Sequence, residues 1–237
     1  MITKRDTGSG WWLLGAAAVV AVCALPSNGA LILTTADTRG ADAGIDFINQ
    51  STNAGTANAV NLRVNASTNQ AAYLAFGLPD FTGGTSGASL SFTKTGSNST
   101  SVNVYGLVDG HPGENWSESV ITYANAPGVD TASSSAAGIA LLDSDTVLLG
   151  TISFGTGQLV LSLSGSALEN FLSADTDGRV TIIVKGTADR GAFLRTKEWT
   201  AGAPALSLPS ASIVIPEPTS LSCLAVAVAG LVRRRRT

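Results

Sequence analysis

The sequence predicts an all-β fold, a jelly-roll-like β-sandwich, between two terminal segments of different character. Short runs in which apolar and polar residues alternate predict the strands, for example at 90–93, 102–104, 159–163 and 180–184. Stretches rich in Gly, Ser, Asn and Thr separate these runs, and strands do not alternate with long helices. Many short strands joined by polar turns favour two packed sheets, and a jelly roll closes sheet edges economically at this size.

One short helix is expected at 166–172. Ser166 is a suitable N-cap, and Glu169 follows three residues later, as in a capping box. We therefore expect a single helix between two strands.

Charge is unevenly distributed along the 237 residues. Lys4, Arg5 and the arginines at 233–236 hold six of the 14 basic residues. The body between the two ends keeps eight basic and 15 acidic residues, a net charge of −7. An acidic body disfavours nucleic acid as a partner.

Both cysteines lie in the terminal apolar segments, at Cys23 and Cys223. The body therefore has no residues for a disulfide, a CxxC motif or a cysteine zinc site.

The N-terminal segment has the three parts of a secretory signal peptide. Lys4 and Arg5 precede an apolar run that ends at Leu25, and small residues follow up to Ala30. We predict a signal peptide over 1–30, cleaved after Ala30. The alternative is a retained transmembrane anchor, for which the run is short.

The C-terminal segment, 210–237, combines a linker with three ordered features: a Pro-Glu-Pro motif, an apolar run and an arginine cluster. These are Pro216, Glu217 and Pro218, then 221–232, then Arg233, Arg234, Arg235 and Arg236. The segment resembles the PEP-CTERM sorting signal of Gram-negative environmental bacteria. That resemblance implies a membrane sorting protease as a partner, and extracellular polysaccharide or biofilm matrix as the destination.

Helix geometry agrees with a sorting tag. About a dozen apolar residues span roughly 18–20 Å as a helix, less than the hydrocarbon core of about 30 Å, so we expect only transient membrane insertion. The arginines would hold this end on the cytoplasmic side until processing. The alternative is an ordinary tail anchor.

The body between the ends, 31–209, carries a second resemblance, strongest at Trp116-Ser117-Glu118 and the following residues to Pro127. The other segments, in chain order, are 36–38, 53–56, 62–64, 73–78, 88–92, 102–107, 195–198 and 204–208. Together they resemble the DNRLRE-type domain, grouped with carbohydrate-binding module family 96. Tyr123, Ala75 and Thr196 stand where the family usually has Trp, Arg and Ser. The resemblance implies a jelly roll that binds acidic polysaccharide.

Five residues are candidates for contact with a sugar. Aromatic rings stack on sugar faces, and Lys or Arg side chains pair with anionic groups. The candidates are Trp116, Tyr123, Arg195, Lys197 and Trp199. The alternative is that Trp116, Glu118 and Thr122 form a buried lock between turn and strand.

Carboxylates near the start of the body suggest a calcium site. Asp37, Asp42 and Asp46 are the first candidates, and Asp143 with Asp145 the second. The alternative is that Asp residues here serve turns, as the stretch 175–178 indicates.

The motifs of catalysis are weak. His111, the single histidine, lies in the turn sequence 109–113 and is expected to be an exposed loop residue. No Gly-x-Ser-x-Gly elbow accompanies a serine, and nothing sets the separation of Glu114 and Glu118. The sequence therefore predicts a secreted or cell-surface, non-catalytic protein that binds or sits within extracellular polysaccharide. A purely structural matrix protein and, third, a polysaccharide-active enzyme are the alternatives.

Overall fold

The computed structural model describes residues 30–78, 84–96 and 98–209. Residues 1–29 of the predicted signal peptide, both cysteines and the predicted sorting motif lie outside the described residues. Within the described part of the chain, no helix has the length and apolar character needed to cross a membrane.

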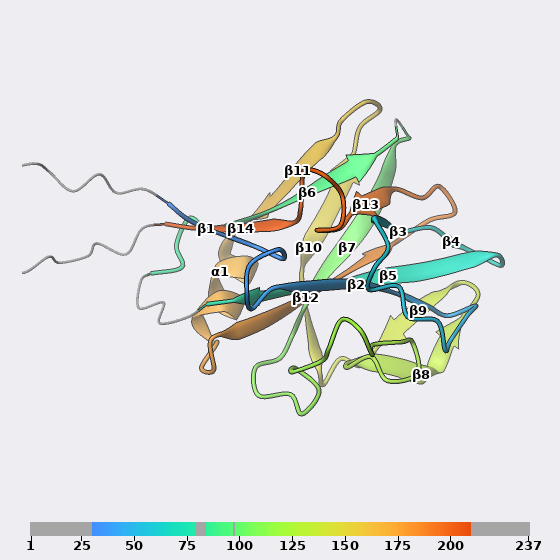
Figure 1. Ribbon diagram of the computed structural model, residues 1–237, viewed down its shortest axis with the longest axis horizontal. Coiled ribbons are helices and arrows are strands. Elements are labelled where there is room, and N and C mark those ends of the chain that lie inside the picture. Colours follow the sequence, from blue (N-terminus) through green and yellow to red (C-terminus); the bar gives the residue numbers. More distant parts are fainter. Residues whose placement is uncertain (1–29, 79–83, 97, 210–237) are drawn as a thin grey trace, which may run out of the picture.

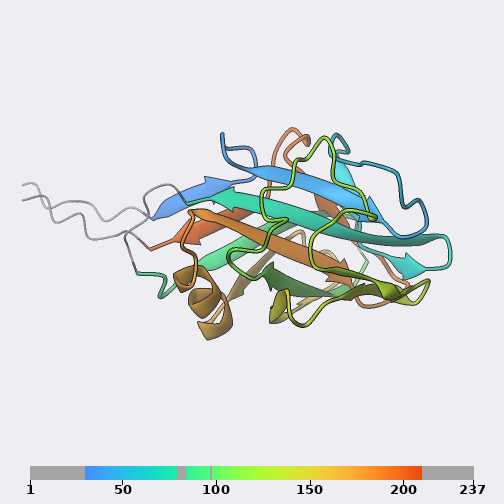
Figure 2. The same cartoon turned by 90° about the horizontal axis from the view of Figure 1, so that it is seen from below.

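Two antiparallel sheets pack face to face, which confirms the predicted sandwich (Figures 1 and 2). The first, the β6 sheet, contains β1 (Leu31–Thr34), β3 (Ala59–Asn61), β6 (Ser89–Thr95), β11 (Val160–Ser164), β13 (Phe193–Arg195) and β14 (Ala205–Leu208). The second, the β5 sheet, contains β2 (Ala41–Asp46), β4 (Val64–Asn65), β5 (Thr68–Gly77), β7 (Thr100–Leu107), β10 (Thr146–Phe154) and β12 (Arg179–Gly186). Consecutive strands repeatedly change sheet, as in a jelly roll.

The inner core lies between the two sheets. The alternating residues of β6 send Leu90 and Phe92 inward, where they join Leu74 and Phe76 of β5 and Ile182 of β12. Each large apolar side chain contributes roughly 1.5–3 kcal/mol when fully buried. The alternation seen in the sequence thus supplies one continuous core.

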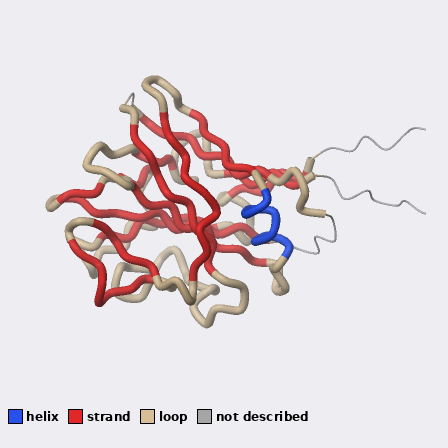
Figure 3. The backbone as a smooth tube through the Cα atoms, turned by 180° about the vertical axis from the view of Figure 1, so that it is seen from behind, coloured by secondary structure: helices blue, strands red, loops and turns tan. Residues whose placement is uncertain are grey.

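The helix α1 (Ser166–Ser173) closes the end of the sandwich at which the paired strands β1 and β14 also lie (Figure 3). Leu168 and Leu172 pack into the inner core. The predicted capping box is wrong: Gly165 is the N-cap, without a side-chain hydrogen bond. The Glu169 carboxylate instead accepts a hydrogen bond from Gly87 N at 2.7 Å, so it fastens the loop before β6 to the helix.

A second apolar cluster covers the outer face of the β5 sheet. The long segment between β7 and β10 crosses this face and includes the hairpin β8 (Val129–Ser135) and β9 (Gly138–Leu141) (Figure 1). It places Ile121 and Ile139 on the outward side chains Ile45, Tyr73 and Ile183. Strands β2, β5 and β12 are therefore buried on both faces, whereas no described segment forms a comparable apolar cover on the outer face of the β6 sheet.

Glu114 lies in this covering segment and is only 3% exposed. Its carboxylate accepts a hydrogen bond from Gly110 N at 3.2 Å. Burial, followed by the negative charge of Asp177, raises the pKa of Glu114 to about 7. The folded protein therefore binds this proton more tightly than the unfolded chain does, and ionisation of Glu114 opposes folding.

Replacing this carboxyl should make stability less dependent on pH. The contribution of Glu114 is favourable near pH 4 and is lost between about pH 4.5 and 7, as its proton leaves. We expect the unfolding free energy of Glu114→Gln, taken relative to that of the parent, to be roughly 1–3 kcal/mol higher at pH 8 than at pH 4. Urea unfolding at both pH values measures this gain. The exposed Asp143→Asn is the control, and an equal gain there would contradict the assignment.

Candidate functional site

The five predicted sugar-contact residues fall into two regions. Trp116 and Tyr123 lie in the segment that covers the β5 sheet. Arg195 ends β13, and Lys197 and Trp199 lie in the turn that follows it. The structure therefore does not gather the five side chains into one site.

Trp116 is held on several sides. Its ring packs edge-on against Tyr73, with centroids 6.0 Å apart, and its Nε1 donates to Thr181 Oγ1 at 3.0 Å. The guanidinium of Arg179 lies 5.8 Å from the ring centroid and donates to the Trp116 carbonyl at 3.2 Å. Trp116 thus mainly fixes the covering segment to β5 and β12, in keeping with the predicted lock.

Part of Trp116 still reaches the surface. It borders a shallow pocket of about 300 Å³, lined by Pro112, Gly113, Asn115, Trp116, Ser117, Val120, Ile121 and Asn125. Amide and hydroxyl groups are the polar components of this lining, and it contains no charged side chain.

Tyr123 is a correction to the predicted contact set. Its side chain is in the outer core, 2% exposed, and packs edge-on against Phe47 with centroids 5.4 Å apart. The ring therefore has no free face on which a sugar could stack.

Arg195 and Trp199 form a stacked pair at the free face of the β6 sheet. The guanidinium lies 4.8 Å from the ring centroid, and Arg195 Nη1 donates to the Ala201 carbonyl at 3.2 Å. Within the described residues, Arg195 Nη2 has no hydrogen-bond acceptor. Phe193, two residues earlier on the same face, is 48% exposed. A cation, an aromatic ring and an exposed phenyl group therefore occur together.

The sheet beside this pair presents rows of small hydroxyl side chains. The register aligns Thr34, Ala205, Ser91 and Ser162 in one row, and Ile32, Ser207, Ser89 and Ser164 in the next. The outward positions of these strands, and of β3 and β13, carry no carboxylate. This face is therefore uncharged apart from Arg195, although the body as a whole is acidic.

A glycine allows the turn after β13 to lie on this face. Gly202 has φ +87°, and a Cβ there would stand 2.8 Å from Thr93 Oγ1. Both the positive φ and the close contact favour glycine. The position of Trp199 at the rim of the face depends on this approach.

Lys197 belongs to a charged cluster at the open edge of β2. Its ammonium pairs with Glu118, and both side chains are about a quarter exposed, at 24% and 22%. Its backbone N–H donates to Asp42 Oδ2 at 2.8 Å, and Asp42 N–H reaches Glu118 Oε2 at 3.4 Å. Burial by itself lowers the pKa of Lys197, but the pairing with Glu118 outweighs it and the pKa is raised.

The motif segments of the sequence meet at this cluster. Asn53 donates from its side chain to the carbonyls of Glu118 and Ile121, both at 2.7 Å. Thr196 Oγ1 donates to the Ala57 carbonyl at 2.5 Å, so the threonine keeps the hydroxyl that a serine would supply. Four segments far apart in the chain therefore join at one edge, with a structural role that their spacing did not reveal.

The predicted calcium set is not assembled. Asp37 Oδ2 accepts from Thr34 N in a turn, and Asp46 accepts from Ile48 N, Asn49 Nδ2 and Gln70 Nε2. Asp42 lies in β2 and faces other partners. In the second candidate pair, Asp145 lies 3.4 Å from His111 Nε2, and Asp143 is exposed.

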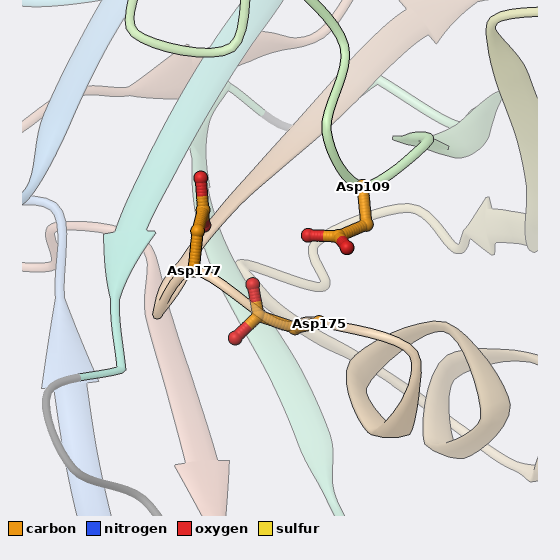
Figure 4. A group of neighbouring side chains, drawn as sticks. All are labelled: Asp109, Asp175 and Asp177. Atoms are coloured by element: carbon orange, nitrogen blue, oxygen red, sulfur yellow. The ribbon is translucent and has the colours of Figure 1, made fainter.

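A group of three carboxylates that the sequence analysis did not predict lies elsewhere. Asp109, Asp175 and Asp177 offer oxygens within 4.8 Å of one another (Figure 4). These residues also accept turn hydrogen bonds, from Thr176, Gly178 and Arg179. The Asp175 turn is thus confirmed, and we assign the group no ligand.

The residues considered for catalysis have separate partners. His111 lies in a turn as expected, but its side chain is only 18% exposed, and its Nδ1 accepts from Gly113 N at 2.9 Å. Glu114 is buried, whereas Glu118 pairs with Lys197. The two glutamates therefore do not face one another as an acid and base pair would.

The Glu118–Lys197 pair should stabilise the fold more than an exposed pair does. We expect Glu118→Gln to cost about 1–2 kcal/mol in unfolding free energy, because it leaves the ammonium partly buried without its partner. The matched control is Asp189→Asn at the Arg63–Asp189 pair, whose side chains are 46% and 68% exposed, so that the loss of stability is expected to be much smaller. Equal losses in chemical denaturation would contradict the assignment.

A comparison with protein families gives a match over part of the chain. Residues 34–143 match the family model of carbohydrate-binding module family 96, a range that includes Asp42, Trp116 and Glu118 but ends before Arg195. No curated protein matches the chain. Over residues 34–143, the sandwich is therefore similar to a carbohydrate-binding module.

Proposed function

We propose that this protein is an exported, non-catalytic protein that binds extracellular polysaccharide on the outer face of the β6 sheet. The observation that carries the proposal is the stacked pair of Arg195 and Trp199 at the rim of a face lined by hydroxyl groups. The match over residues 34–143 supports glycan binding as the class of activity.

The chemistry of this face suits a polymer with anionic sugar units. A partly exposed ring offers a surface to a sugar face, and the guanidinium has a donor left for a carboxylate or hydroxyl. Serine and threonine hydroxyls alongside can donate to or accept from sugar hydroxyls. The absence of carboxylates from the outward strand positions lets an anionic chain approach an otherwise acidic protein.

Export belongs to the same proposal and rests on the terminal segments. The signal-peptide pattern at 1–30 would deliver the body outside the cell, and the tag around Pro216, Glu217 and Pro218 would present it to a membrane sorting protease. The sandwich over 31–209 would then be the mature binding unit.

The binding face predicts the effect of two substitutions. Trp199→Ala and Arg195→Ala should each weaken binding to an acidic polysaccharide such as alginate by about tenfold, which corresponds to about 1.4 kcal/mol. Isothermal titration or affinity electrophoresis against acidic and neutral polysaccharides measures this change. Arg63→Ala, at an exposed arginine elsewhere on the sandwich, is the control. If neither the parent nor the Arg63→Ala control binds any glycan, the result favours a purely structural matrix protein.

The terminal segments predict the mass of the mature protein. Protein recovered from the outside of producing cells should begin at Leu31 and lack residues beyond the Pro-Glu-Pro motif. Intact-mass spectrometry with N-terminal peptide mapping checks both ends. Recovery of the whole 237-residue chain from the cytosol would overturn the export part of the proposal.

A further inference from the structure

Three side-chain oxygens at one edge of the sandwich are buried and have no hydrogen-bond partner. They are Thr35 Oγ1, Asp42 Oδ1 and Glu198 Oε2. Thr35 and Asp42 are both 0% exposed. A buried polar group without a partner costs roughly 1–3 kcal/mol, more when it is charged, so three such groups together require a common partner.

The three oxygens belong to one place. The Thr35 hydroxyl and the Glu198 carboxylate both lie within reach of the Asp42 carboxyl, but Thr35 Oγ1, Asp42 Oδ1 and Glu198 Oε2 form no hydrogen bond of good geometry with one another. The other oxygen of Asp42, Oδ2, accepts from Lys197 N at 2.8 Å, which fixes the carboxylate and leaves Oδ1 for another partner. Asp42 comes from β2 of the β5 sheet, whereas Thr35 follows β1 and Glu198 follows β13, both in the β6 sheet.

The charges around these oxygens do not balance. Three carboxylates, Asp42, Glu118 and Glu198, face a single ammonium, and Lys197 directs that ammonium to Glu118. The Asp42 and Glu198 carboxyls therefore lie beside each other, while the neighbouring ammonium of Lys197 is paired with Glu118.

A water molecule would satisfy only part of this demand. Water can donate hydrogen bonds to two oxygens, but it does not offset the repulsion between two carboxylates. A metal ion coordinates the oxygens and also offsets the repulsion between the carboxylates, and the chemistry of the ligand atoms determines which metal suits the site. Carboxylate and hydroxyl oxygens without nitrogen or sulfur suit a hard cation, and calcium tolerates irregular oxygen sets better than magnesium does.

We propose that Thr35 Oγ1, Asp42 Oδ1 and Glu198 Oε2 form a binding site for a hard divalent cation, with calcium as the ion to test. Such an ion would link the two sheets at the edge where the motif segments meet. The proposal does not depend on the proposed glycan binding, because the site is part of the frame of the sandwich and not of its free face.

The experiment is thermal unfolding of the purified chain without any polysaccharide. The protein is stripped with a chelator and melted with and without 2 mM calcium chloride, and elemental analysis counts bound metal. We expect calcium to raise the melting temperature by about 5 °C or more, with one ion per chain. Glu198→Gln should remove this rise, and the near-isosteric Thr35→Val should reduce it at least by half.

The matched control is Asp177→Asn, at the other group of neighbouring carboxylates, which should keep the full rise. Loss of the rise in Asp177→Asn with retention in Glu198→Gln would place the ion at Asp109, Asp175 and Asp177 and overturn the proposal. An absence of any calcium effect or bound divalent metal in the parent would also overturn it, in favour of a shared proton or water. If Glu198→Gln does not fold, Thr35→Val decides, and an unchanged rise there overturns the site.

Discussion

The charged cluster at the open edge of β2 is the contact on which the rest of the architecture depends. An edge strand presents backbone groups without partners, and a sandwich needs its two sheets held in register there. Glu118 meets the backbone N–H of Asp42, and Asp42 accepts the backbone N–H of Lys197. One set of polar contacts therefore joins the edge of the β5 sheet, the covering segment and the turn after β13.

This cluster also determines which face of the protein is free. Because Glu118 and Trp116 fasten the covering segment, the outer face of the β5 sheet becomes a second core that buries Tyr73 and Tyr123. Among the described residues the β6 sheet has no corresponding cover, and its outward strand positions carry no charge other than Arg195. The two sheets differ in this way because the covering segment packs on the β5 sheet.

The strands and their two-layer packing could be predicted because alternation is a local signal. Leu90 and Phe92, or Val180 and Ile182, reveal their inward direction within a few residues. The helix was also predictable, but not its cap, because Glu169 is taken by Gly87 in a distant loop. A local capping pattern carries no information about a hydrogen-bond donor that comes from a distant loop.

The site was less predictable, because its residues combine segments that lie far apart in the chain. The Trp116-x-Glu118 motif and the 196–198 stretch were recognised separately, but their meeting at Asp42 depends on strand pairing across the sandwich. The burial of Tyr123 has a signal in the sequence of β5, on which its segment packs. Residues 71–76 are apolar without interruption, and a strand with two apolar faces indicates that both are covered.

The small size of the proposed binding face has a consequence for how the protein would work. One ring and one guanidinium supply only a few kcal/mol, so the affinity of a single chain for a single sugar site is expected to be weak. A polysaccharide repeats its unit many times, and chains fixed in the same matrix would bind it at several points at once. The gain from multivalent attachment then exceeds any single contact. The proposed delivery to the surface by the terminal segments and the proposed modest binding by the sandwich would thus act together, since weak sites hold a polymer only when many copies are placed beside it.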